Sequence, residues 1–116
     1  QCIEWLWDSM DWPQTDMEAF EAFMAPYLSP LGAIILGVAA GLSEELVVRG
    51  VLQPRLGIWL PNALFTSLHA LQYNWDALLV VFGLGMVCGV VRKKANTTTN
   101  AIVHGMHNVL VLVFDY

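Results

Sequence analysis

Charged side chains are scarce in this chain, and their scarcity indicates which class of protein it belongs to. Of the 116 residues, 13% are charged and 57% are hydrophobic, whereas a soluble domain carries about 25% charged residues. The net charge of −5 supplies no basic stripe to neutralise phosphates, which argues against a nucleic-acid partner. The composition is typical of helices that lie in a lipid bilayer, so the bilayer is the first expected partner.

Cysteine is also rare. Cys2 and Cys88 are too few and too far apart to predict a disulfide framework or a Cys-type zinc site, and Cys88 is interpreted as a small residue in a helix. The chain opens on Gln1 without a basic region followed by a short apolar stretch and a cleavage site. We therefore expect no signal peptide and leave open that the chain is a fragment of a longer protein.

Two regions differ in composition. Residues 1–30 interleave acidic residues with tryptophan and phenylalanine, which predicts either an interfacial segment or a solvated connector whose aromatic side chains pack on the rest. Residues 31–116 are mostly apolar. Because a spanning helix needs roughly 20 residues, the predicted fold is an all-α, polytopic transmembrane bundle of about four membrane helices.

We expect four helices. They cover about residues 31–53, 61–71, 75–91 and 100–114, and the second of them begins at either 58 or 61. The first should end before Pro54, because proline breaks a helix interior. The second is short for a span, so we expect it to pack inside the bundle or to stop partway across. The run 97–100, Thr-Thr-Thr-Asn, offers N-cap candidates for the last helix.

Small residues recur four apart at Gly37 and Gly41 and at Gly85 and Gly89, which predicts close helix packing.

The basic residues gather in two connections between these helices. Arg49 and Arg55 flank the end of the first helix, and 92–94, Arg-Lys-Lys, follow the third. By the positive-inside rule both connections lie in the cytoplasm, and the acidic segment lies on the opposite side. The sequence thus predicts a multi-pass integral membrane protein, and a bacterial inner membrane fits its short connections.

Glu44 and Glu45 stand side by side within the most apolar stretch of the chain. A charged side chain at membrane depth costs at least about 2.5–3.5 kcal/mol, so intramembrane carboxylates indicate a functional site. Other polar and aromatic residues share helix faces at a spacing of four. These pairs are Glu45 with Arg49, Phe65 with His69, and His104 with Asn108.

The same residues carry a family resemblance. Glu44-Glu45-x-x-x-Arg49, Phe65-x-x-x-His69 and His104-x-x-x-Asn108 resemble, in order, the three motifs of the CAAX protease and bacteriocin-processing family, also called CPBP or Abi. The resemblance covers about residues 31–116 and implies a glutamate-dependent intramembrane endopeptidase acting on a peptide or protein. Family members usually have more helices, so flanking spans are expected outside this chain. The motifs do not predict a prenylated substrate.

Peptide hydrolysis needs an activated nucleophile and donors for the developing oxyanion. Ser43 adjoins Glu44, and Ser67 precedes His69 by two residues; neither spacing gives a serine a base on its own helix face. A carboxylate that activates water is the simpler interpretation.

The resemblance also implies a role for each motif residue. Glu44 would be the general base, and His69 would hold or activate the water. His104 and Asn108 would donate to the oxyanion. Glu45, Arg49 and Phe65 would support the site, the first two as an ion pair and the third by shaping the cavity. His107 falls outside the motif.

Other classes of function remain open at this stage. No cofactor is expected because the chain lacks His-Glu-x-x-His; if a divalent metal were used, Glu44, His69 and His104 would be its ligands. Intramembrane ionisable groups also mark proton- or ion-coupled transporters, although no internal repeat is found. A non-proteolytic immunity or scaffold protein of the same fold is the other alternative.

Overall fold

The computed structural model describes residues 2–114, with side chains from residue 5 onward. All regular structure in this range is helical, which confirms the predicted all-α class. The predicted regions 1–30 and 31–116 include residues 1, 115 and 116, which lie outside the described residues. Their division stays a prediction.

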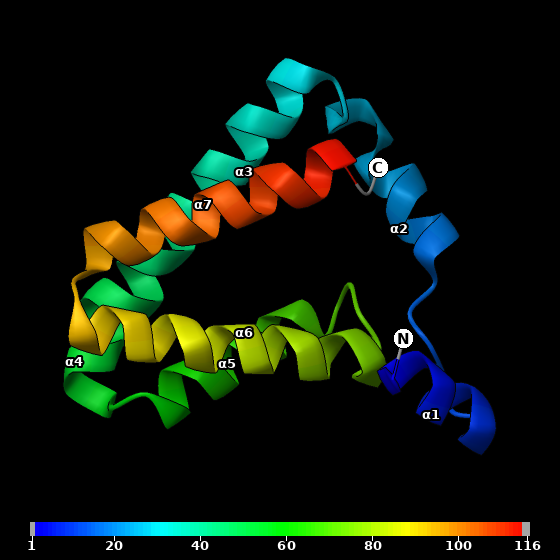
Figure 1. Cartoon of the computed structure of the whole chain (residues 1–116), viewed down its shortest axis with the longest axis horizontal. Coiled ribbons are helices and arrows are strands. Elements are labelled where there is room, and N and C mark those ends of the chain that lie inside the picture. The colour runs from blue at the N-terminus through cyan, green and yellow to red at the C-terminus, as the bar shows by residue number, and fades with distance from the viewer. Residues whose placement is uncertain (1, 115–116) are drawn as a thin grey trace.

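The amino-terminal region contains α1 (Cys2–Met10), α2 (Met17–Met24) and the 3-10 turn η1 (Ala25–Tyr27). The remaining elements are α3 (Pro30–Glu44), the π-helix η2 (Glu45–Leu52), α4 (Gln53–Leu56), α5 (Trp59–His69), α6 (Trp75–Lys94) and α7 (Thr97–Phe114). They form two helix pairs joined at one end (Figure 1). α3 packs along α7, α5 packs along α6, and α4 carries the chain between the pairs.

Two helical stretches are long and apolar enough to cross a membrane, Pro30–Leu56 and Trp75–Lys94. Only 28% and 17% of their apolar windows are buried inside the protein, whereas the core helix of a soluble domain would be mostly covered. α5 has 11 residues and is too short for a span. α7 has 18 residues but includes polar side chains that face its neighbours. The four-helix membrane count stays a prediction.

Small residues bring α3 and α7 into backbone contact. A Cβ atom on Gly41 would lie 2.6 Å from the backbone nitrogen of Gly105, and one on Gly37 would lie 2.9 Å from that of Val109. Both distances are shorter than real Cβ contacts, so neither position has room for a side chain. The predicted close packing at Gly37 and Gly41 is confirmed, and it holds α3 and α7 in fixed register.

The first predicted helix does not end before Pro54. It continues through η2 and α4 to Leu56 and ends at Gly57, whose φ of 75° suits glycine. The backbone N–H of Gln53 bonds to the carbonyl of Val48, five residues back. A new α-helical turn therefore begins at Gln53, and Pro54 falls in its first turn, where no N–H donor is needed.

The N-cap expected at 97–100 is also wrong. Asn96 caps α7, because its Oδ1 accepts a hydrogen bond of 2.8 Å from the backbone N–H of Thr99.

The amino-terminal region is fastened to the start of α6. The Thr15 hydroxyl donates to Asp76 at 2.7 Å and accepts from the backbone N–H of Asn74 at 2.9 Å. Trp7 is buried and meets Trp12 edge to face, with 5.0 Å between ring centroids. At least part of this segment therefore packs on the bundle.

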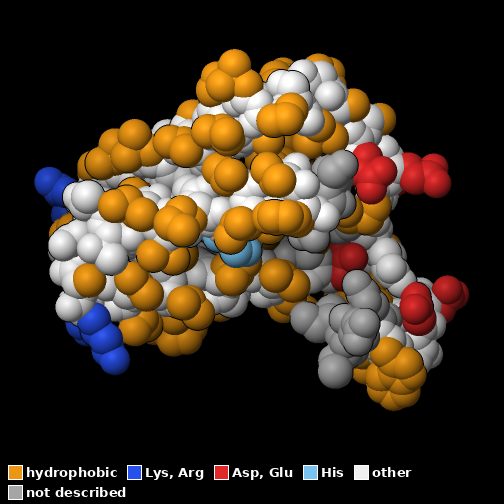
Figure 2. All heavy atoms as spheres, turned by 45° about the horizontal axis from the view of Figure 1, so that its top comes forward, with side chains coloured by type: hydrophobic (Ala, Val, Ile, Leu, Met, Phe, Trp, Pro, Cys, Tyr) orange, Lys and Arg blue, Asp and Glu red, His pale blue; other side chains and the backbone are white. Residues whose placement is uncertain are grey.

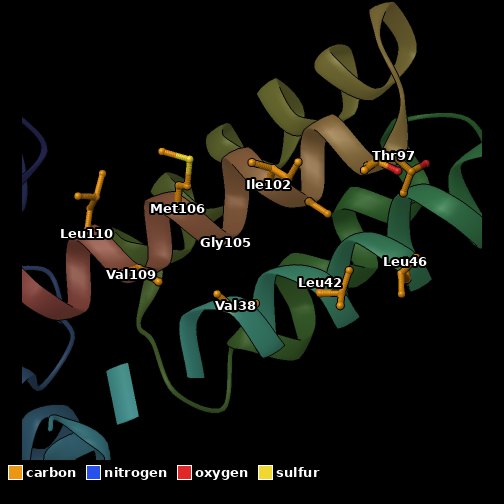
Figure 3. Close-up of a pocket in the computed structure, with 11 residues that line it drawn as sticks. Val38, Leu42, Leu46, Thr97, Ile102, Gly105, Met106, Val109 and Leu110 are labelled. Atoms are coloured by element: carbon orange, nitrogen blue, oxygen red, sulfur yellow. The ribbon is translucent and has the colours of Figure 1, made fainter. Parts of the chain in front are cut away.

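Charge is segregated along the molecule. Lysine and arginine side chains gather at one end and acidic side chains at the other, with apolar surface between them (Figure 2). The gathering of the basic side chains at one end is consistent with the positive-inside rule for membrane proteins. An apolar groove of about 500 Å³ opens between α3 and α7 on this surface, lined by residues such as Val38, Leu42 and Met106 (Figure 3).

Candidate active site

The carboxylate of Glu45 is the buried centre of the polar cluster. Its side chain is 0% exposed, and it lies at the first position of η2. Oε1 lies 2.8 Å from His104 Nδ1, while Oε2 accepts a hydrogen bond from the Asn100 amide and lies 3.7 Å from Arg49 Nε. A buried charge is tolerated only with such partners. Glu45 therefore ties η2 to two successive turns of α7.

The guanidinium of Arg49 continues the network to the other helix pair. Its Nη2 donates to the Gly85 carbonyl of α6 at 2.8 Å, and its Cζ lies 5.3 Å from the centre of the Phe65 ring on α5. A Cβ atom on Gly85 would lie 1.8 Å from Oδ1 of Asn62, so only glycine fits there. Arg49 thus holds three helices around Glu45.

His104 joins the two adjacent glutamates. Since an ionised carboxylate only accepts hydrogen bonds, Nδ1–H of His104 donates to Glu45. Nε2, on the other side of the ring, lies 3.6 Å from Oε2 of Glu44. That separation is an ion-pair distance rather than a hydrogen bond. The Glu44 side chain is 31% exposed, so it is the carboxylate of the pair that can meet water.

His69 lies in the last turn of α5, where its Nδ1 is 2.9 Å from the Phe65 carbonyl oxygen. A carbonyl only accepts, so Nδ1–H donates and Nε2 of the neutral ring is left as an acceptor. The ring stacks parallel to Tyr73, with 6° between planes. Phe65 is buried between the two histidines, its centroid 4.6 Å from that of His69 and 6.3 Å from that of His104.

The motif residues are thus not all in contact. Glu44, Glu45, Arg49 and His104 form one network, and Phe65 connects it to His69. Asn108 lies half-buried on α7, one turn beyond His104. Within residues 5–114, no hydrogen bond joins its side chain to another motif residue. His107 is exposed on the surface of α7.

Three polar residues of the network were not predicted from the sequence. Asn100 is 0% exposed and donates to Glu45. Asn62 donates to the Phe82 carbonyl at 3.0 Å, and Gln53 donates to that of Gly89 at 2.8 Å. Asn100 had a usable signal, because it precedes His104 by four residues and so shares its face.

A metal site at Glu44, His69 and His104 is not assembled. Among the described residues, the His, Cys, Asp and Glu side chains that come close enough to share an ion are Glu45, Cys88 and His104, whose ligand atoms all lie within 4.8 Å of one another.

One of three comparisons with known proteins gives a match. Residues 26–110 match the family model described as "Type II CAAX prenyl endopeptidase Rce1-like". The match includes every motif residue described above. No curated protein and no solved structure gives a significant match to the chain.

Proposed function

Because the chain belongs to the type II CAAX prenyl endopeptidase Rce1-like family, we propose that it hydrolyses peptide bonds within the membrane with a glutamate-activated water. The observation that carries the proposal is the line from Glu44 through His104 to Glu45. The carboxylate of Glu44 can meet water, and it lies beside the His104 ring, which the buried carboxylate of Glu45 holds in place.

In the proposed reaction Glu44 is the general base. A water molecule beside its carboxylate gives a proton to Glu44 while the water oxygen attacks the carbonyl carbon of the peptide bond. The carbonyl oxygen then becomes an oxyanion. When the carbon–nitrogen bond breaks, Glu44 returns its proton to the leaving amine, so the carboxylate is regenerated. Its exposed fraction gives it access to both water and substrate.

His104 and Asn108 are assigned to the oxyanion. With Nδ1 of His104 held by Glu45, Nε2 is the nitrogen available to the reaction. In the charged ring both nitrogens donate, so Nε2–H would stabilise the oxyanion. Asn108, one turn further on the same helix, would donate from its amide.

His69 is assigned to the water. Its Nδ1 is occupied by the Phe65 carbonyl, which leaves Nε2 as an acceptor for one water hydrogen. Phe65 packs between the two histidine rings and shapes the space between them.

Glu45 and Arg49 support the site without meeting the substrate, since both side chains are buried. The proposed reaction uses no metal or other cofactor.

The segregated charge supports a multi-pass arrangement in the membrane. We place the basic connections in the cytoplasm and the acidic segment on the opposite side, with α5 reaching only partway across. A bacterial inner membrane remains our assignment. The proposed substrate is a peptide or protein, with no commitment to a prenyl group.

Comparative proteomics of membranes that express the wild type, Glu44→Gln or Glu18→Gln would test the proposal. Glu18 is the matched control, because it is an exposed glutamate in α2 outside the network. We expect cleavage products in the wild type and in Glu18→Gln, and at least a hundredfold fewer in Glu44→Gln.

Products that persist in Glu44→Gln would overturn the assignment of the base. A cellular phenotype retained in both Glu44→Ala and His69→Ala would instead favour a non-proteolytic immunity or scaffold protein, or a proton- or ion-coupled transporter.

A further inference from the structure

Cys88 has no part in the proposed hydrolysis, yet its thiol lies at the site. It comes from α6, whereas the neighbouring Glu45 and His104 come from η2 and α7. One ligand atom from each of these three residues lies within 4.8 Å of the other two. In tetrahedral zinc, bonds of 2.0–2.3 Å place ligand atoms roughly 3.3–3.6 Å apart. Contractions of up to about 1.5 Å would therefore complete three corners of such a site.

The ligand chemistry selects the ion. A thiolate, an imidazole and one carboxylate suit zinc and similar soft divalent ions, whereas calcium and magnesium prefer oxygen ligands alone. Three protein ligands also leave a fourth position for water. The thiol distinguishes this set from the metal ligands expected from the sequence, which contained no cysteine.

The two oxygens of Glu45 have separate partners. Oε2 takes the positive partner Arg49 and the amide of Asn100. Oε1 faces Nδ1 of His104, where only a shared proton lies between carboxylate and ring. An ion bound by these two atoms would replace that proton and leave the contacts of Oε2 in place, while the 2.8 Å between Oε1 and Nδ1 would lengthen by roughly 0.5 Å.

We propose that Glu45, Cys88 and His104 form an inhibitory binding site for zinc or a similar thiophilic divalent cation. Binding releases the protons of the Cys88 thiol and of His104 Nδ1. The ion then draws Nδ1 of His104 out of its contact with Glu45 and so displaces Nε2 from the oxyanion position, and peptide hydrolysis slows. The inhibitory effect rests on the proposed function, whereas the binding does not.

Cobalt(II), used as a spectroscopic probe, tests the binding directly in the purified full chain. A thiolate bound to cobalt gives a charge-transfer absorption, which imidazole and carboxylate ligands do not give. We expect this band to saturate at one ion per chain in the wild type and to vanish in Cys88→Ser. Cys2→Ser is the matched control and should keep the band. Zinc should displace cobalt from the wild type and abolish its band.

A band that survives Cys88→Ser, or no band in the wild type, would overturn the site. Circular dichroism of each variant shows that the comparison is made between folded chains. His104→Gln should also lower the cobalt affinity, by at least tenfold, since it removes a second ligand.

A second measurement tests the inhibition. For each variant, cleavage with zinc is divided by cleavage without it, so differences in basal activity cancel. The zinc concentration for half inhibition should rise at least tenfold in Cys88→Ser and stay within twofold in Cys2→Ser. An unchanged value in Cys88→Ser would refute inhibition through this site. A cobalt band in a wild type that cleaves nothing would retain the ion site and refute the proposed peptidase instead.

Discussion

Nδ1 of His104 lies 2.8 Å from Oε1 of Glu45, which joins residues 59 positions apart in the chain. The carboxylate is fully buried, whereas the ring is partly exposed. A fully buried side chain therefore sets the orientation of one that solvent can reach. Asn100 and Arg49 hold the other oxygen of Glu45, Oε2. The orientation of the His104 ring therefore depends on the whole buried network.

Replacement of Asn100 by alanine should weaken both folding and turnover. It removes a donor to the buried Glu45, and hydrogen bonds to charged groups contribute about 1.5–3 kcal/mol. The free energy of unfolding should fall by about that amount in a denaturant titration. Thr99→Ala is the control, because Thr99 is exposed in the same turn and should change stability by less than about 0.5 kcal/mol. Equal effects of the two substitutions would contradict the role given to Asn100.

Arg49→Met should be among the most destabilising substitutions in the chain. It leaves Glu45 buried without its cation, and breaking a buried pair costs about 3–5 kcal/mol. Thermal unfolding in detergent measures the effect. Arg55→Met offers the comparison, since Arg55 is exposed and donates to the Val51 carbonyl one turn away. We expect a loss below about 1 kcal/mol there, and a similar loss at Arg49 would show that the ion pair is dispensable.

His104→Gln should lower kcat more than it raises KM. Removal of an oxyanion donor costs about 10²–10³ in kcat. His107→Gln serves as the control, because His107 lies on the exposed surface of the same helix. Steady-state kinetics on one peptide substrate would check both variants. A drop in kcat of the same size in His107→Gln would point to a general effect on α7.

Two glycine substitutions should move stability in opposite directions. Gly41→Ala places a Cβ atom 2.6 Å from the Gly105 backbone nitrogen, which forces α3 and α7 apart. Gly83 lies in α6 with nothing within 4 Å of such an atom. Gly83→Ala should therefore stabilise by about 0.5–1 kcal/mol through helix propensity alone. Melting temperatures in detergent measure both, and a stabilised Gly41→Ala would disprove the close approach of the two helices.

Removal of divalent ions should leave hydrolysis intact, since the proposed reaction uses only side chains and water. Cleavage after dialysis against a chelator should match or exceed the untreated value, because any bound inhibitory ion is also withdrawn. Activity that is lost on chelation and restored by stoichiometric zinc would contradict the metal-free mechanism.

The helices and the motif residues followed from local sequence pattern. Apolar runs placed α3, α5, α6 and α7, and a spacing of four put Glu45 and Arg49 on one face, where the structure pairs them. Pattern could not distinguish a cap from a buried donor, so Asn100 was assigned to the helix start instead of to Glu45.

Contacts between segments that are far apart in the chain could not be predicted from the sequence alone. Cys88 was interpreted as a small residue in a helix, because nothing in the local sequence of α6 indicates that Glu45 and His104 lie beside it. The roles of Glu44, His69 and Asn108 stay predictions, since catalysis depends on a substrate that no spacing specifies.

The π-helix at Glu45–Leu52 sets the angle about the helix axis between Glu45 and Gln53. Its hydrogen bonds run five residues back, so each closed loop holds one residue more than an α-helical turn. Deletion of one residue here would let the segment close as ordinary α-helix and keep its flanking faces in place, whereas a deletion within a regular α-helix rotates everything on one side of it by about 100°. A deletion at an exposed position such as Val47 would accordingly be tolerated better than one in the middle of α6.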